Sequence, residues 1–260
     1  MESENLKDVS SLAREKYNFY QNKLGYTIYT LLAGSYCSIG MAFAYNAASG
    51  FYASPSLSGI SNLIMGIAFA LSFTLITFAG SELFTGNVFV ITVGALSKKI
   101  TFKNAISILI FCYIGNLMGA SIMGAIISMS GVMSNTAGEM LETFCLTKIS
   151  LPIHQLFLRG VMCNVLVCLG TWMASKIKSD IARMTALLWV VAGFVTSGYE
   201  HSIANAGLFT MNALSNSIPP GYMQGVLKNM CFVTLGNIVG GALIVACGYW
   251  FANRRTSESN

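Results

Sequence analysis

The longest uncharged stretch of the chain covers residues 24–81 and reads LGYTIYTLLAGSYCSIGMAFAYNAASGFYASPSLSGISNLIMGIAFALSFTLITFAGS, 58 residues without Asp, Glu, Lys or Arg. A soluble domain needs polar side chains over its surface, and charged residues make up about a quarter of an average soluble chain. Only 10% of these 260 residues are charged, whereas 54% are hydrophobic. A spanning helix needs about 20 mostly apolar residues, so we expect a protein that crosses the bilayer several times.

The composition excludes several other classes of protein. Disordered chains are poor in apolar residues, and nucleic-acid-binding domains gather their basic residues on one face. Here the net charge of +5 comes from 15 basic and 10 acidic residues scattered between apolar segments. The seven cysteines form no C-x-x-C pair and lie mostly in apolar segments, so neither a disulfide framework nor a zinc site is expected. We expect no nucleic acid, metal or cofactor as a partner.

Six apolar runs predict an all-α membrane protein with six transmembrane helices. The second and fifth runs are interrupted by polar residues, at 80–87 and 197–205, and we expect these two helices to be broken inside the membrane. The predicted spans are residues 27–48, 60–96, 105–129, 153–175, 184–214 and 229–252.

Basic residues predict the orientation, because short cytoplasmic loops carry an excess of Lys and Arg. Twelve of the 15 basic residues fall on the side that holds both termini, whereas Lys148, Arg159 and Lys228 fall on the other side. Both termini are therefore expected in the cytoplasm, with the protein in the inner or plasma membrane. Residues 10–24 are predicted to form an amphipathic helix on the membrane surface.

An internal repeat divides the chain into two halves. Phe, Gly, Asn and Gly recur at the same spacing in 111–119 and 232–240, an offset of 121 residues. E-x-x-x-x-N occurs at 82–87 and 200–205, an offset of 118 residues, and G-x-x-C occurs at 34–37 and 160–163, an offset of 126 residues. Each half would contain three spans, an odd number, so the halves would form an inverted repeat with the pathway between them near the bilayer midplane.

The repeat gives the following division of the chain. We expect a cytoplasmic amphipathic segment at 1–26, a first three-helix repeat at 27–129, an external loop at 130–152, a second three-helix repeat at 153–252 and a cytoplasmic tail at 253–260. The pairs Gly115/Gly119 and Gly236/Gly240 have the G-x-x-x-G spacing that lets helices pack closely. We assign these glycines to packing and not to a substrate.

Two carboxylates lie at equivalent positions in the predicted breaks. Glu82 is followed five residues later by Asn87, and Glu200 by Asn205. An ionisable group inside a membrane costs roughly 2.5–3.5 kcal/mol or more, so each needs a role. Ion coordination or proton relay is one interpretation. The symmetric placement favours a structural role, in which each carboxylate caps the exposed N–H groups of a broken helix.

Other polar residues in or near the spans are candidates for contact with a solute. His201 has Leu83 as its counterpart in the first half, and an imidazole in the break could donate a hydrogen bond or a proton near neutral pH. Lys148 precedes the fourth span and is either a solvated loop lysine or an electrostatic lure for anions. Thr85 and Asn164 are neutral groups that could hydrogen-bond a passing solute.

The residues around both breaks resemble the formate/nitrite transporter family. The motifs that carry the resemblance are GSELFTGN at 80–87, SGYEHSIAN at 197–205, NVLVCLGTWM at 164–173 and LGNIVGG at 235–241, within a similarity that covers about residues 10–252. The resemblance implies a homopentamer of aquaporin-like, six-helix protomers, each with its own pore for formate, nitrite or hydrosulfide. The chain also resembles the hydrosulfide-channel branch of that family.

The resemblance implies roles for single residues as well. Phe73 stands where formate-channel members have Leu, which leaves the substrate open. His201 resembles the central pore histidine of the family, Asn237 resembles its hydrogen-bonding neighbour, and Lys148 resembles a lysine of the pore entrance. Thr85 and Asn164 resemble pore-lining polar residues. Phe69 and Phe194 resemble one apolar constriction of the pore, and Leu83 and Phe73 resemble the other.

These features predict how an anion would pass. An isolated buried charge is very costly, so we expect the anion to take up a proton, from bulk water or through His201, and to cross as the neutral acid. Two alternatives stay open: a proton-coupled secondary transporter of the same anions, and an aquaporin-like channel for neutral solutes, against which the absence of Asn-Pro-Ala counts. No enzyme is expected, because the sequence has neither G-x-S-G nor H-E-x-x-H.

Overall fold

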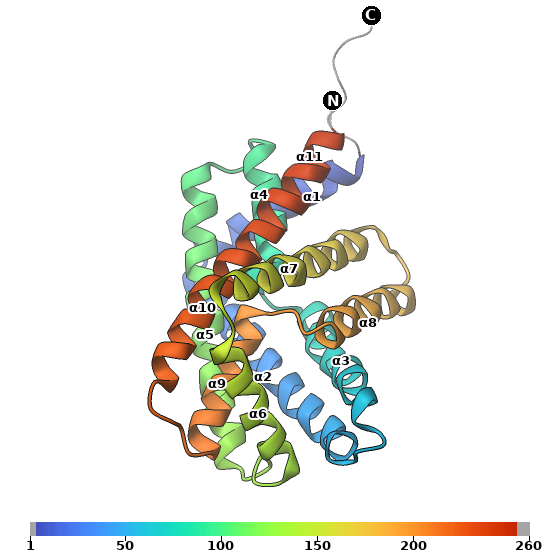
Figure 1. Ribbon diagram of the computed structural model, residues 1–260. Helices are drawn as coiled ribbons and strands as arrows, with labels where there is room; N and C mark the ends of the chain where they lie inside the picture. The colour runs from blue at the N-terminus through green and yellow to red at the C-terminus, as the bar shows by residue number, and fades with distance from the viewer. Residues whose placement is uncertain (1–3, 254–260) are drawn as a thin grey trace, which may run out of the picture.

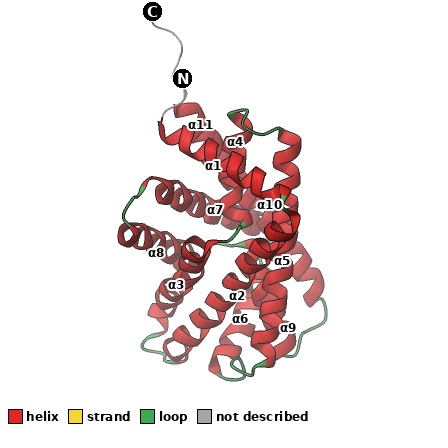
Figure 2. Ribbon diagram, turned by 180° about the vertical axis from the view of Figure 1, so that it is seen from behind, coloured by secondary structure: helices red, strands yellow, loops and turns green. Residues whose placement is uncertain are grey.

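The computed structural model describes residues 4–253, and every regular element within that range is a helix (Figures 1 and 2). The predicted tail at 253–260, beyond its first residue, and residues 1–3 of the N-terminal segment lie outside the described residues. The elements are α1 (Glu4–Gln21), α2 (Lys23–Ala53), α3 (Ser58–Thr74), the π-helical segment η1 (Leu75–Gly80), α4 (Phe84–Leu96), α5 (Phe102–Met129), α6 (Thr136–Ser150), α7 (Ile153–Lys176), α8 (Asp180–Thr196), α9 (Ser202–Ser215), α10 (Tyr222–Ile238), the π-helical segment η2 (Val239–Ala246) and α11 (Cys247–Asn253).

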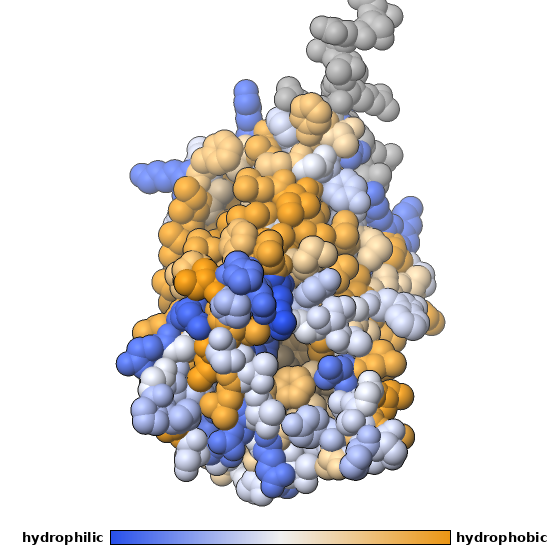
Figure 3. Space-filling view, in the orientation of Figure 1, coloured by the Kyte–Doolittle hydropathy of each residue, from blue (hydrophilic) through white to orange (hydrophobic). Residues whose placement is uncertain are grey.

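Among residues 4–253, five helical segments are long and apolar enough to cross a membrane: Lys23–Ala53, Ser58–Gly80, Phe102–Met129, Ile153–Lys176 and Tyr222–Asn253. The apolar helix α4 is shorter, with 13 residues, and the helices α8 and α9 have 17 and 14 residues. Hydrophobic side chains gather over α10 and α11 in the upper half of the molecule (Figure 3). The all-helical membrane architecture is confirmed, and the count of six spans stays a prediction.

Several helices extend beyond the predicted spans. The first span was predicted from residue 27, but α2 begins at Lys23 because the side chain of Asn22 accepts the N–H of Gly25 at 3.2 Å and caps the helix. The last was predicted from residue 229, but α10 begins at Tyr222, directly after Gly221, whose φ is +82°. Polar residues in the first turns of both helices concealed these starts.

Within the two predicted interruptions, the chain leaves helical geometry at residues 81–83 and 197–201. Both non-helical stretches are shorter than the predicted interruptions, because α4 begins at Phe84 and α9 at Ser202. Gly80, at the first point, has a φ of +78°, and Gly198, at the second, a φ of +70°. Left-handed backbone of this kind is nearly free of strain for glycine. From the two breaks, near the middle of the molecule, α4 extends upward and α9 downward (Figure 1).

Glycines bring the helices α2 and α5 into close contact. A Cβ on Gly34 would overlap the carbonyl oxygen of Asn116, and a Cβ on Gly119 would overlap that of Leu31. In the second half, a Cβ on Gly240 would overlap the carbonyl oxygen of Val161 on α7. Only hydrogen fits at these positions, which confirms the packing role predicted for the G-x-x-x-G glycines.

Two helices differ from the sequence prediction. The amphipathic helix expected at 10–24 is α1, which begins at Glu4 and ends at Gln21, and its residues Leu6, Val9 and Ala13 are buried against the protein. The predicted external loop at 130–152 contains the helix α6, whose buried residues recur at helical spacing: Ala137, Met140, Leu141 and Cys145. Acidic residues between these positions made the segment look like a loop.

Candidate functional site

The first break holds a carboxylate that is surrounded by side-chain donors. The Oε1 atom of Glu82 lies 2.7 Å from the Nζ atom of Lys16 on α1. Its Oε2 atom accepts from Asn87 Nδ2 at 2.7 Å and from the Tyr26 hydroxyl at 3.4 Å. This carboxylate therefore joins α1, α2 and α4 at the point where the chain leaves the helix.

The second break repeats the arrangement with other helices. The Nζ atom of Lys148, in the last turn of α6, lies 2.7 Å from Oε1 of Glu200. Asn205 Nδ2 donates to Oε2 of Glu200 at 2.6 Å, and Asn229 Nδ2 approaches the same oxygen at 3.4 Å. Lys148 is thus neither in a loop nor solvated, since its side chain is only 14% exposed.

Asparagines from neighbouring helices hold the broken backbone. Asn116 Oδ1 accepts the N–H of Phe84 at 2.7 Å, and Asn237 Oδ1 accepts the N–H of Ser202 at 3.0 Å. Asn237 also donates to the carbonyl oxygens of Gly160 and Glu200, at 2.8 and 2.9 Å. The prediction that the two glutamates cap these N–H groups is wrong, because their carboxylates bind side-chain donors and the asparagines supply the caps.

The networks confirm two of the three repeat offsets. The capped N–H groups of Phe84 and Ser202 are 118 residues apart, and the asparagines Asn116 and Asn237 are 121 apart. The carbonyls that accept from these asparagines belong to Thr30 and Gly160, which are 130 residues apart. The predicted offset of 126 between the first and fourth spans is therefore wrong by four residues, about one helical turn.

Two hydrogen bonds fix the ring of His201, the residue before α9. Its Nδ1 atom accepts the N–H of Ala204 at 3.1 Å, as the side chain of an N-cap residue does. Its Nε2 atom lies 2.9 Å from the Oγ1 atom of Thr85. An acceptor at Nδ1 requires the proton of the neutral imidazole to be on Nε2, so His201 donates to Thr85. Leu83, the counterpart before α4, caps nothing with its side chain.

Aromatic rings surround this histidine. The ring of Phe194 stacks on His201 with an interplanar angle of 19° and a centroid distance of 6.0 Å. Phe73 meets the same imidazole edge-on at 6.0 Å and lies 5.9 Å from Phe194. Phe69 packs against both phenylalanines at 6.2 Å. The four rings come from α3, α8 and the second break, and they form one buried cluster.

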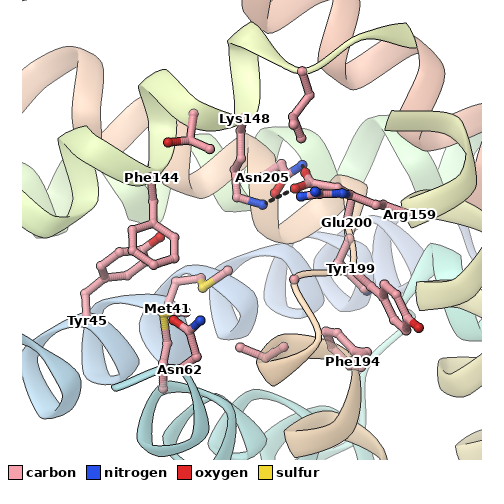
Figure 4. Close-up of a pocket in the computed structure, with 16 residues that line it drawn as sticks. Met41, Tyr45, Asn62, Phe144, Lys148, Arg159, Phe194, Tyr199, Glu200 and Asn205 are labelled. Carbon is pink, nitrogen blue, oxygen red and sulfur yellow. Dashed lines mark hydrogen bonds and ion pairs between the residues drawn. The ribbon is translucent and has the colours of Figure 1, made fainter. Parts of the chain in front are cut away.

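Two cavities reach the ring cluster, and their walls have no residue in common. The α6-side cavity has a volume of about 220 Å³, and its wall includes Phe194, His201, Glu200, Lys148 and Arg159 (Figure 4). The α1-side cavity has a volume of about 540 Å³, and its wall includes Phe73, Leu83, Glu82, Lys16 and Arg183. Each cavity thus ends at one face of the cluster and contains one ion pair of a break.

Not every predicted site residue lines a cavity. Thr85, Asn164, Asn237 and Phe69 are fully buried and lie outside the walls of both described cavities. Asn164 donates from Nδ2 to the carbonyl oxygen of Asn237 at 2.6 Å, so the two residues belong to the backbone support of the second break. Thr85 reaches the site only through its hydrogen bond with His201.

The sequence reasoning missed four residues of these networks, Lys16, Tyr26, Asn116 and Asn229. It also missed Arg159 in the wall of the α6-side cavity. The repeat could have identified Asn116, because it aligns with Asn237 in the motif shared by the third and sixth spans. Lys16 and Asn229 approach glutamates 66 and 29 residues away, and no local pattern indicates such contacts.

Comparisons with known proteins give a consistent result. The chain matches the model of the family described as "Formate/nitrite transporter" over residues 3–251. It is 33% identical to the "Nitrite transporter NirC" of Escherichia coli (strain K12) over 91% of this chain and 87% of that protein. It is 29% identical to the "Formate channel FocA" of Escherichia coli (strain K12) over 88% and 86%.

Solved structures resemble the fold closely. An "FNT family ion channel" superposes with a TM-score of 0.88 at 30% identity and covers 96% of this chain and 99% of that chain. A "Pentameric formate channel with formate bound" superposes with a TM-score of 0.76 at 28% identity, over 89% and 98%. These names describe transporters and channels.

Proposed function

Because the chain belongs to the formate/nitrite transporter family, we propose that it passes small monovalent anions of weak acids, namely formate, nitrite or hydrosulfide, through each protomer. The observation that carries this proposal is a pair of separate cavities that reach one ring cluster, with His201 in the α6-side wall and Phe73, in contact with it, in the α1-side wall. A solute that crosses between these cavities passes a single hydrogen-bond donor among apolar rings.

The barrier favours a neutral species over a bare anion. Phe194 and Phe73 flank His201, and Leu83 adds an apolar side chain on the α1 side. Removing a charge from water without compensation is very costly, whereas a neutral acid loses only its hydrogen bonds. The anion therefore waits in a cavity, takes up a proton and crosses as the acid.

His201 acts in this step as a neutral hydrogen-bond donor. Its Nδ1 atom is occupied by the N–H of Ala204, so a second ring proton would face that N–H and break the cap of α9. The Nε2–H group takes no part in the cap, so its hydrogen bond can be transferred from Thr85 to the oxygen or sulfur of the solute. The proton taken up by the anion then comes from water in the cavity.

The assembly and orientation are part of the same proposal. The similarity to a pentameric formate channel supports a homopentamer in which every protomer has its own pathway. The distribution of Lys and Arg supports cytoplasmic termini in the cell membrane. The α1-side cavity then opens to the cytoplasm and the α6-side cavity to the exterior.

Proton-coupled secondary transport of the same anions is the second candidate. The observation in its favour is that buried rings separate the two cavities. If these rings moved alternately toward one cavity and the other, the solute would enter from one side at a time. Flux that saturates and stops when the pH gradient is collapsed would favour this candidate over a channel.

The test is uptake into proteoliposomes that contain the purified protein. Formate, nitrite and hydrosulfide are supplied separately at equal concentration, with glycerol and urea as neutral solutes and protein-free vesicles as the control. We expect rapid flux of at least one of the anions and none of glycerol. Free passage of glycerol or urea without anion flux would overturn the proposed function and favour the aquaporin-like alternative.

A further inference from the structure

The backbone hydrogen bonds of the two breaks correspond, but the residues that supply them differ at one pair of positions on α2 and α7. The N–H of Glu82 donates to the carbonyl oxygen of Tyr29, and the N–H of Glu200 to that of Arg159, both at 3.2 Å. The Tyr29 ring lies next to Gly80, and the Arg159 guanidinium lies next to the equivalent Gly198, 3.8 and 3.9 Å from the position that a Cβ would take. Tyr29 and Arg159 thus occupy the same place in the two repeats, with a phenol in one cavity and a cation in the other.

Arg159 is the cation of the α6-side cavity for which the described part of the chain supplies no ion-pair partner. Lys148 is neutralised there by Glu200, at 2.7 Å. The guanidinium of Arg159 makes no ion pair or side-chain hydrogen bond with any residue in the range 4–253. Figure 4 shows Lys148 and Arg159 approaching Glu200 from opposite sides. The cavity therefore keeps one positive charge available beside His201.

The cation in the other cavity is already engaged. Arg183 lines the α1-side cavity, but its Nη1 atom lies 3.4 Å from a carboxylate oxygen of Asp180, and its Nη2 atom donates to the carbonyl oxygen of Ile177 at 2.8 Å. Lys16 is paired with Glu82. An available guanidinium next to the break is thus specific to the α6 side.

We propose that Arg159 binds the anion in the α6-side cavity and selects planar oxyanions, formate and nitrite, over hydrosulfide. The guanidinium is a flat fork of N–H donors that fits two oxygens of one anion side by side, whereas a single sulfur cannot make the two parallel hydrogen bonds. Arg159 brings the anion next to His201, and Lys148 serves the ion pair that holds the break. This inference rests on the proposed function.

The experiment measures KM and maximal rate for formate, nitrite and hydrosulfide at low and high ionic strength. The variants are Arg159→Gln, which removes the charge, and Arg159→Lys, which keeps the charge and removes the fork. Lys228→Gln is the matched control, because Lys228 is a partly buried cation on the same side that bonds the carbonyl oxygen of Leu151 and lies outside the cavity wall.

We expect Arg159→Gln to raise the KM of all three anions, by about tenfold for formate and nitrite, which corresponds to about 1.4 kcal/mol. The salt dependence of KM should flatten as well. Arg159→Lys should restore the salt dependence and the KM of hydrosulfide, while the KM of formate and nitrite stays high. Lys228→Gln should leave every KM near its wild-type value.

Three results would overturn the inference while wild-type flux is normal. They are an unchanged KM in Arg159→Gln, an equal increase in Lys228→Gln, and full restoration of the formate KM by Arg159→Lys. If Arg159→Gln does not assemble, Arg159→Lys alone shows whether anion binding depends on the positive charge or on the planar guanidinium. Absence of anion flux in the wild-type protein would instead contradict the proposed function itself.

Discussion

The two ring nitrogens of His201 make different hydrogen bonds. Through Nδ1 it caps the first turn of α9, and through Nε2–H it donates to Thr85 between the two cavities. A leucine at the equivalent position of the first repeat can do neither. One asymmetry between the two breaks therefore lies in this side chain, which supplies the only polar group in the ring cluster of the described residues.

The first prediction concerns the hydrogen-bond donor of His201. In His201→Asn the side chain can still cap Ala204, because asparagine is a good N-cap residue, but it is too short to replace Nε2. We expect flux to fall by up to about tenfold, since a hydrogen bond to the neutral acid contributes roughly 0.5–1.5 kcal/mol. Proteoliposome uptake is the measurement, and His154→Asn, at the exposed start of α7, is the control. Equal flux and an equal pH profile in wild type and His201→Asn would refute the role.

The second prediction concerns the buried ion pair of the second break. Lys148→Met leaves the carboxylate of Glu200, which is 2% exposed, without its counter-charge. Breaking a buried pair from one side costs about 3–5 kcal/mol, so thermal unfolding in detergent should occur at a clearly lower temperature. Asp180→Asn is the control, because Asp180 is 73% exposed and its pair with Arg183 contributes little. A melting temperature in Lys148→Met as high as in Asp180→Asn would contradict the account.

At the scale of elements, the broken helices depend on neighbours that remain continuous. Asn116 on α5 and Asn237 on α10 each bond three backbone groups around a break. Backbone groups inside a membrane have no water to bond, so these side chains replace the missing turn. The glycines of the same helices let the asparagines come close enough to do so.

The third prediction follows from these three hydrogen bonds. Asn237→Ala removes all of them and leaves buried backbone groups unpaired, which should cost about 3 kcal/mol at roughly 1 kcal/mol for each bond. Asn46→Ala is the matched control, because Asn46 bonds mainly the carbonyl oxygen of its own helix at Ala42. Reversible unfolding by denaturant measures both variants. Similar losses in the two variants would show that Asn237 does not hold the break.

The fourth prediction concerns the contact between α2 and α5. Gly34→Ala places a methyl group on the carbonyl oxygen of Asn116, so the helices must separate and the cap of Phe84 must shift. Overpacking of this kind costs typically about 1–3 kcal/mol. Gly50→Ala, with nothing near its Cβ position, should cost far less. Equal thermal stability of the two variants would be evidence against tight packing at Gly34.

For the molecule as a whole, sequence patterns predicted what depends on local composition. Long uncharged runs predicted the membrane helices, and the polar interruptions predicted where they break. The offset between the first and fourth spans was wrong because it relied on Gly34 and Gly160. Small packing residues recur on one helix face every turn, so a match shifted by one turn looks equally good. The hydrogen bonds of Asn116 and Asn237 give the correct offset.

The charges of the site could not be predicted, because their partners are distant in sequence. Lys16 and Lys148 approach glutamates 66 and 52 residues away, and each depends on how a separate helix, α1 or α6, docks against the break. The expected loop around Lys148 turned out to be a helix for the same reason. The role proposed for Arg159 follows only from its comparison with Tyr29, which occupies the equivalent place in the folded repeat.

In the proposed mechanism, a weak-acid anion crosses the ring cluster after it takes up a proton. The most direct measurement is the initial rate of formate uptake into proteoliposomes at a fixed total concentration while the external pH is lowered stepwise. We predict that the rate rises steeply as the pH falls, because the fraction of protonated formate next to His201 increases. A rate that stays flat over the whole pH range, with formate still crossing, would contradict this mechanism.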